Sequence, residues 1–137
     1  MQFALDSRLK NDSIFITDLN LCSLRLIDNS NFPWVILIPK ISPNIIEITD
    51  LRLEDFHQLN NEILSTAKLM RSIFKADKLN IATIGNAVSQ MHYHIIARYK
   101  TDKLFPKTVW GDKFNKYNQT ESTKIINLIK EPLPNYL

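Results

Sequence analysis

The amino-acid sequence predicts an α+β domain in which a mostly antiparallel five-stranded sheet carries one long helix and a short C-terminal helix. Three observations lead to this fold class. Short apolar segments follow one another closely before residue 40, a single helical stretch comes next, and two more strand-like segments follow it. Closely spaced strands pair as antiparallel hairpins, and their sheet offers a face on which one amphipathic helix can bury its apolar side.

Each element has a local signal. In residues 53–74 apolar side chains recur at steps of three and four, which is typical of an amphipathic helix. A shorter helix is expected over 121–130, where Pro132 stops it. The strands are expected at 13–19 (SIFITDL), 22–28 (CSLRLID), 34–39 (WVILIP), 79–84 (LNIATI) and 90–99 (QMHYHIIARY).

The composition limits the class of protein. A chain of 137 residues without repeats or a flexible linker predicts one domain, residues 1–137. No apolar run approaches the roughly 18 residues that a membrane span needs, and charges interrupt the N-terminus where a signal peptide would be apolar. A cytoplasmic location without a membrane partner is therefore expected. The single cysteine, Cys22, excludes an intrachain disulfide and a cysteine-built zinc site.

The net charge of +3 is concentrated in one segment. Residues 98–116 contain six basic side chains against two acidic ones, whereas charges elsewhere nearly balance. Such a segment favours an anionic ligand, although a solvated lysine-rich loop explains the same pattern. Aromatic residues are interleaved there, but nothing matches a nucleic-acid-binding module, so no nucleic-acid partner is expected.

Two of the three histidines, His92 and His94, alternate in the last predicted strand with Gln90 one step before them. Alternate residues of a strand point to one face, with neighbours on that face about 6.5–7 Å apart. The pair can be structural, or bind a metal, or supply a nucleophile or general base. A metal needs a third ligand, and His57 is the only other histidine. No metal site and no cofactor are therefore expected.

A turn before this strand favours the catalytic interpretation. Gly85, one of only two glycines, stands in the sequence IGNA. A glycine permits close approach of the backbone, and neighbouring N–H groups can cradle an anion. Together with Asn86, the two histidines and the basic segment, this turn predicts a phosphate site.

The motif QMHYHII resembles the signature of the histidine triad (HIT) superfamily, in which three histidines alternate with apolar residues, except that Gln90 stands at the first histidine. The flanking sequences LNIATIGNAVS and WVILIPK are also similar to that family, and FPKTVWG resembles a bacterial HIT-like branch. The resemblance covers residues 13–111 and implies a HIT-like fold, with residues 112–137 as a C-terminal extension.

The resemblance also implies roles for individual residues. His92 would be the nucleophile that forms a covalent nucleotidyl-imidazole, and His94 would contact the phosphate. Gly85 and Asn86 would form the phosphate turn. Asn80 would make a further phosphate contact, Asp28 would bind the ribose hydroxyls, and Trp110 would lie by the active site.

Two positions depart from the family. Gln90 can accept and donate hydrogen bonds but cannot pass a proton, so it either orients its neighbours or lowers activity by the ~10²–10⁴-fold of a lost general acid. Trp34 stands where most relatives have a fourth histidine, and it either stacks on a base or fills the core.

The resemblance implies a nucleotide hydrolase or nucleotidyl transferase acting at the α-phosphate of a phosphoramidate or dinucleoside polyphosphate. Its partners would be a purine nucleotide or nucleotide conjugate and a second copy of the chain in a homodimer. The alternative is a nucleotide-binding or partner-binding protein with weak or no catalysis.

Overall fold

Five antiparallel strands form one sheet in the order β1-β2-β3-β5-β4 in the computed structural model, which describes residues 3–137. This architecture confirms the predicted fold class. Each strand lies within two or three residues of its expected place. The strands are β1 (Ser13–Asp18), β2 (Cys22–Ile27), β3 (Trp34–Pro39), β4 (Lys78–Ala82) and β5 (Tyr93–Arg98).

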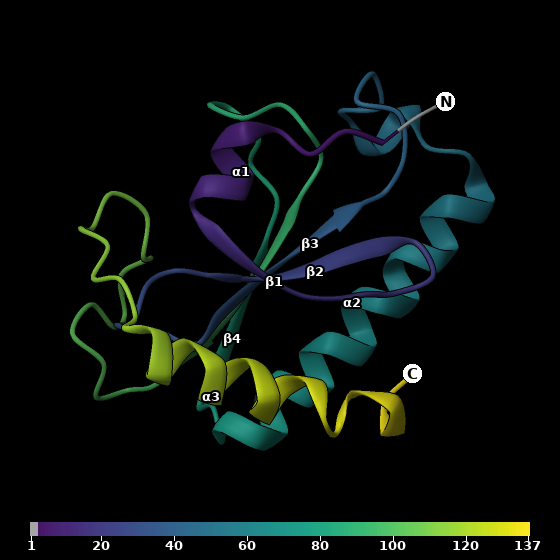
Figure 1. Cartoon of the computed structure of the whole chain (residues 1–137). Helices are drawn as coiled ribbons and strands as arrows, with labels where there is room; N and C mark the ends of the chain where they lie inside the picture. Colours follow the sequence, from purple (N-terminus) through teal and green to yellow (C-terminus); the bar gives the residue numbers. More distant parts are fainter. Residues whose placement is uncertain (1–2) are drawn as a thin grey trace.

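The long helix α2 (Leu53–Phe74) crosses one face of the sheet. The shorter helix α3 (Gln119–Lys130) lies at one end of the sheet (Figure 1). Asn118 caps α3 by accepting a hydrogen bond from the Glu121 N–H. A short helix α1 (Ser7–Asn11) precedes β1 and was not predicted, because five residues are too few to show helical periodicity. Two 3₁₀ turns, η1 (Ile48–Asp50) and η2 (Leu133–Asn135), were also not predicted.

The sheet has an apolar core on each face. In β2, β3 and β5 successive side chains are buried on both sides, which explains why these strands are nearly continuous apolar runs. One core packs against α2, and its strand residues are Leu24, Leu26, Val35, Leu37 and Ile95. The opposite core contains Ile27, Trp34, Ile36 and Ile96 of the sheet with Leu9, Phe32 and Val109 from the segments above it.

A buried carboxylate joins the first hairpin to α2. Glu62 accepts hydrogen bonds from the backbone N–H groups of Leu21 and Cys22, both at 2.8 Å. Gln58, one turn earlier in α2, donates to the same carboxylate at 2.6 Å. Burial, together with the negative charge of Glu62, raises the pKa of the Cys22 thiol and keeps it protonated.

The segment after β5 is held by a buried ion pair. Arg98 is 1 % exposed and binds the Asp102 carboxylate through Nε at 2.8 Å and Nη2 at 3.0 Å. Its guanidinium also lies over the rings of Phe32 and Phe105. This pair fixes the start of residues 99–116, which return across the face of the sheet opposite α2.

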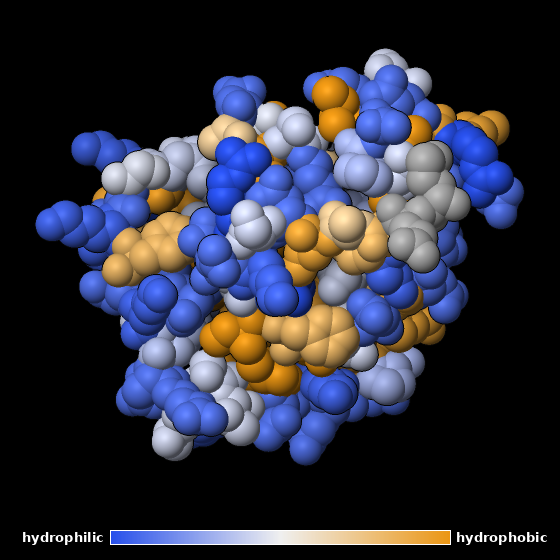
Figure 2. Space-filling model, turned by 45° about the horizontal axis from the view of Figure 1, so that its top comes forward, coloured by the Kyte–Doolittle hydropathy of each residue, from blue (hydrophilic) through white to orange (hydrophobic). Residues whose placement is uncertain are grey.

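In the described part of the chain, no helix combines the length and apolar composition needed to span a bilayer. On the face that Figure 2 shows, hydrophobic side chains form small groups among hydrophilic ones.

Candidate active site

His92, just before β5, and His94, near its start, lie side by side on the face opposite α2. Strand β5 begins at Tyr93, so the expected strand from residue 90 is three residues too long. His92 therefore belongs to the extended segment that leads into β5. Both imidazoles are buried, and their ring centroids are 4.9 Å apart.

The two imidazoles line a cavity of about 260 Å³. The sheet supplies its floor, and the turn after β4 and residues 109–114 supply its walls. The predicted residues Gly85, Asn86 and Trp110 line the same cavity. The remaining lining residues are Leu9, Asp12, Ile27, Trp34, Ile84, Ala87, Val88, Val109, Gly111 and Phe114.

The hydrogen bond of His92 defines which of its nitrogens can react. Its Nδ1 lies 2.7 Å from the backbone carbonyl oxygen of Gln90. A carbonyl only accepts hydrogen bonds, so Nδ1 carries the proton and donates it. In the neutral ring the lone pair of Nε2 is then free for attack on an electrophile.

His94 has the opposite arrangement. The indole Nε1–H of Trp34 donates to His94 Nδ1 at 3.0 Å, and an indole N–H can only donate. Nδ1 of His94 is therefore the acceptor, and in the neutral ring the proton is on Nε2. Burial and the neighbouring His92 lower the pKa of His94 to about 3, so the ring is neutral near pH 7.

Aromatic rings surround His94. The Trp110 ring meets it edge-on at a centroid distance of 4.7 Å, and Trp34 contacts both Trp110 and Phe114. Trp110 is 37 % exposed, whereas Trp34 is 3 % exposed. Trp34 thus fills the core beneath the cavity, and Trp110 is the tryptophan that a ligand can reach.

The turn after β4 contains a glycine in a left-handed conformation and backbone donors on residues that line the cavity. Gly85 has φ = +70°, a left-handed conformation that other residues adopt only with strain. Among the described residues, no hydrogen bond uses a backbone N–H group of residues 85–88. These donors are available to an anion beside His92.

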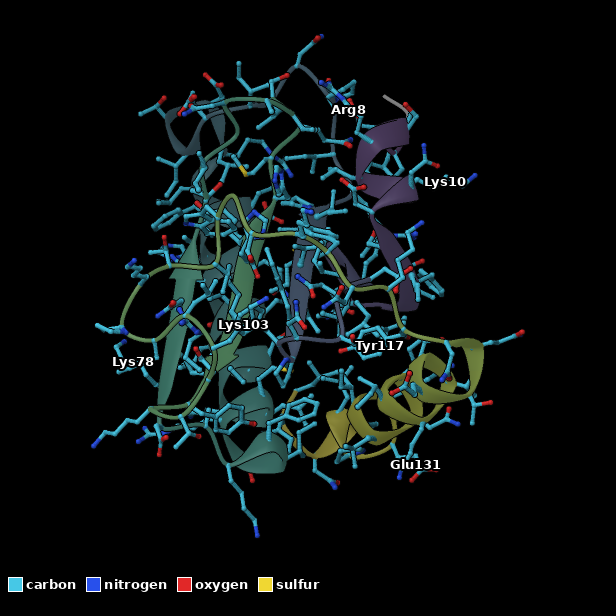
Figure 3. All side chains as sticks on the ribbon, turned by 90° about the vertical axis from the view of Figure 1, so that its left-hand side faces the viewer. Arg8, Lys10, Lys78, Lys103, Tyr117 and Glu131 are labelled. Atoms are coloured by element: carbon cyan, nitrogen blue, oxygen red, sulfur yellow. The ribbon has the colours of Figure 1, made fainter. Side chains whose placement is uncertain are left out.

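Gln90 does not line the cavity. Its side-chain Oε1 accepts from the Asp6 N–H and its Nε2 donates to the Ala4 carbonyl, both at 2.8 Å. Arg8 adds a second connection by donating to the Ala87 carbonyl at 2.8 Å. Figure 1 shows the N-terminal segment beside the loop between β4 and β5, and Figure 3 shows Arg8 on the side of α1 that faces this loop.

Asp28 and Asn80 also lie outside the cavity. The Asp28 carboxylate accepts from the backbone N–H of Tyr117 at 2.9 Å, which anchors the segment before α3. Asn80 Oδ1 accepts from Arg98 Nη1 at 2.8 Å, on the part of β4 away from the turn. Both side chains hold neighbouring segments in place.

The basic segment contributes aromatic rather than charged groups to the cavity. No lysine or arginine of residues 3–137 lines it. Lys103 instead pairs with Asp112 at 3.0 Å, which closes the loop on itself. The residues of this segment that face the cavity are Val109, Trp110 and Phe114. The two aromatic ones belong to the aromatic residues that alternate with lysines in the sequence.

No three histidine, cysteine, aspartate or glutamate side chains of residues 3–137 are grouped as metal ligands would be. The two adjacent imidazoles already have their Nδ1 atoms engaged, one as donor and one as acceptor. The arrangement suits attack by one neutral imidazole and hydrogen bonding by the other.

Sequence reasoning missed several contributors to the site. The N-terminal segment provides Leu9 and Asp12 as lining residues and Arg8 beside the glycine turn. Nothing in the local sequence of residues 3–12 signals these contacts, because they depend on the docking of this segment by Gln90. The hydrogen bond from Trp34 to His94 was also not expected.

Comparisons with known proteins identify the family and agree with the fold. The HIT domain family model matches residues 8–101. A histidine triad protein from Bradyrhizobium japonicum is 39 % identical, with a TM-score of 0.93, over 97 % of this chain and 99 % of its own. One from Marinobacter aquaeolei is 32 % identical, with a TM-score of 0.95, over 100 % of both chains.

A third histidine triad protein, from Sinorhizobium meliloti, is 36 % identical, with a TM-score of 0.91, over 94 % of this chain and 96 % of its own. No curated protein matches the chain significantly. The family match covers more than half of the chain and includes both histidines, the glycine turn and all five strands in full, so the protein belongs to the histidine triad (HIT) family.

Proposed function

We propose that this protein cleaves purine nucleotide conjugates at the α-phosphate, through a covalent nucleotidyl intermediate on His92. Phosphoramidates and dinucleoside polyphosphates are the proposed substrates. The observation that carries this proposal is the hydrogen bond from His92 Nδ1 to the Gln90 carbonyl. It leaves Nε2 as an unprotonated nucleophile beside a glycine turn with available N–H groups.

The first step is attack by His92 Nε2 on the α-phosphorus. A phosphorus–nitrogen bond forms, and the bond to the leaving group breaks with its electron pair on the leaving atom, which takes a proton from water. The imidazole becomes positively charged, and its Nδ1–H bond to the Gln90 carbonyl stabilises that charge. Water then attacks phosphorus and gives up a proton to the hydroxide formed in the first step, the bond to His92 breaks to release the neutral ring, and a nucleoside monophosphate is the product.

His94 and the glycine turn would bind the phosphate oxygens. His94 Nε2–H is a neutral donor, and Gly85 and Asn86 line the same cavity as His92. Donors fixed before the reaction stabilise the charge that develops on the phosphate oxygens.

The apolar part of the cavity supports the proposal of a subsite for the base. Trp110 and Phe114 offer ring faces, and Ile27 and Val88 offer aliphatic contacts. A ribose contact by Asp28 would require its carboxylate to turn from the Tyr117 N–H that it now binds. Asp12 is a carboxylate that already lines the cavity.

One observation favours a second candidate function, nucleotide binding with weak or no catalysis. Both ends of the Gln90 amide are used to dock the N-terminal segment, so this side chain supplies no acid for the leaving group. A substrate whose leaving group needs protonation by the protein would then bind without turnover.

The test is the release of AMP from adenosine phosphoramidate by the wild-type protein and by His92→Ala. Turnover by the wild type that falls at least ~10²-fold in the variant supports the hydrolase. Saturable binding of the substrate with equal background rates in both proteins supports the binding protein instead.

We also propose a homodimer joined through β4. This strand is at an edge of the sheet, where its outer backbone groups can pair with another strand. Large hydrophobic side chains are exposed on it and on the segments beside it: Ile46, Ile48, Ile81 and Ile84 are each 42–48 % exposed. The cytoplasmic location expected from the sequence stays a prediction.

A further inference from the structure

We propose that Trp34 is a positioning residue that holds His94 as a neutral imidazole with its proton on Nε2, aimed at the phosphate. The contact with phosphate rests on the proposed function. The position of the proton on His94 does not rest on that function, because it follows from the hydrogen bond between Trp34 and His94.

The sheet places the two residues together. Trp34 and His94 lie on neighbouring strands, β3 and β5, and the register pairs Trp34 with Ile96 and Ile36 with His94. Directly paired residues of antiparallel strands point to one face, so Trp34 and His94 are diagonal neighbours on the cavity side. The Nε1–Nδ1 distance of 3.0 Å is that of a good hydrogen bond.

The indole has little freedom to adopt another orientation. Trp34 is 3 % exposed, and its ring packs against Trp110 and Phe114 at centroid distances of 5.5 and 5.7 Å. A buried indole N–H left without an acceptor costs roughly as much as a lost hydrogen bond. Packing and hydrogen bonding therefore hold the same orientation.

The residue type determines the protonation of His94. A histidine at position 34 could either donate to His94 or accept from it, so a proton could move between the two rings. Tryptophan cannot accept, and it cannot take up a proton. His94 Nδ1 is thus always the acceptor, and Nε2 is the nitrogen that presents a proton to the cavity.

A neutral His94 has a consequence for the neighbouring ring. When His92 Nε2 bonds to phosphorus, His92 becomes positively charged, and His94 lies 4.9 Å away between ring centroids. A second positive charge at that distance would oppose formation of the intermediate. The titratable groups that line the cavity are His92, His94 and Asp12, so His92 is the positive neighbour that matters.

The experiment is long-range ¹H–¹⁵N NMR of the histidine rings in the full chain without ligand. The chain has three histidines, and His57 is exposed on α2, where it serves as an internal reference. We expect His94 to show protonated Nε2, acceptor Nδ1 and no titration above about pH 4, consistent with its lowered pKa. His94 with a proton on Nδ1, or charged near pH 7, would overturn the proposal.

Trp34→Phe keeps an aromatic ring and removes the donor. We expect mixed tautomers of His94 and a titration midpoint higher by roughly one pH unit, the equivalent of one hydrogen bond. The matched control is Trp110→Phe, because Trp110 also contacts the His94 ring but donates no hydrogen bond to it. Unchanged His94 signals in Trp34→Phe, or the same change in both variants, would contradict the role of Trp34.

If Trp34→Phe does not fold, the wild-type spectrum still decides the tautomer, and Trp34→His supplies a second variant that retains a donor. In a kinetic assay Trp34→Phe should lower kcat roughly tenfold, with a smaller change in KM, and Trp34→His should recover part of the loss. Absence of turnover in the wild type would refute the proposed function alone, because the NMR result does not depend on catalysis.

Discussion

His92 and His94 are separated by one residue, and yet their imidazoles are prepared for different tasks. His92 donates through Nδ1 to a carbonyl, and His94 accepts through Nδ1 from an indole. The first arrangement frees a lone pair, and the second presents a proton. Two rings of opposite hydrogen-bond polarity face one cavity, so one can attack phosphorus and the other can bind its oxygens.

Asn80 is the residue for which the resemblance and the geometry differ most. Its Oδ1 accepts from the buried guanidinium of Arg98. We predict that Asn80→Ala lowers the free energy of unfolding by about 1.5–3 kcal/mol, the value of a hydrogen bond to a charged group, and leaves nucleotide affinity unchanged. Chemical denaturation and calorimetric titration measure the two effects, and a weaker affinity at unchanged stability would restore the phosphate role.

Trp110 was located in the cavity through the family resemblance, whereas the other four residues that the sequence located there are brought together by local geometry. His92 and His94 alternate at a strand end, Gly85 makes the turn before it, and Asn86 follows Gly85. Gln90 was expected on the same face because alternation was extended over residues 90–99, but β5 begins only at Tyr93. Before that residue the chain is free to turn a side chain elsewhere.

At the level of elements, Gln90 holds the N-terminal segment in place. The oxygen and the nitrogen of the Gln90 side-chain amide bind the backbone of residues 6 and 4, and α1 follows directly. We predict that Gln90→Ala accelerates hydrogen exchange at the Asp6 amide and lowers stability by about 1–3 kcal/mol.

Gln90→Glu is the matched control, since it keeps the acceptor for Asp6 but loses the donor to Ala4. Its Asp6 amide should remain more protected than that of the alanine variant. Equal exchange in the wild type and in Gln90→Ala would show that the segment docks without this side chain.

The segment after β5 depends on Asp102. Its pKa is held well below the ordinary value, first by the hydrogen bonds from Arg98 and then by backbone N–H groups that offset burial. A carboxylate whose folded pKa is lowered stabilises the fold above its unfolded pKa, about 3.9, and that contribution is lost as the pH falls further.

We therefore predict that the free energy of unfolding falls steeply below about pH 4 in the wild type and less steeply in Asp102→Asn. At pH 7 the variant should be less stable by about 3–5 kcal/mol, because Arg98 remains buried without its partner. Denaturation curves across this pH range measure both effects, and parallel pH profiles would contradict the assignment.

The sequence predicted the elements that have a hydrophobic periodicity or a continuous apolar run. The stripe of α2 and the apolar runs of β2 and β3 were located within one residue. The helix α1 has only five residues and was not detected, and neither was the course of residues 99–116. That course depends on the Arg98–Asp102 pair and on Phe32, which are distant contacts that no local pattern encodes.

For the whole molecule, the exposed edge of β4 predicts self-association. Sedimentation of the wild type should give twice the chain mass of 16.0 kDa, and Ile81→Glu on β4 should shift it to the monomer. Leu128→Glu on α3 is the control, since Leu128 is similarly exposed but lies away from the edge. A monomeric wild type, or the same shift in both variants, would exclude β4 as the interface.

Attack by His92 is tested most directly by the intact mass of the protein after brief mixing with adenosine phosphoramidate and a quench without acid. We predict an added nucleotidyl group on the wild type that is absent from His92→Ala. An adduct that persists in His92→Ala would contradict attack by His92. Absence of both adduct and released AMP would contradict cleavage of this substrate and favour the binding protein.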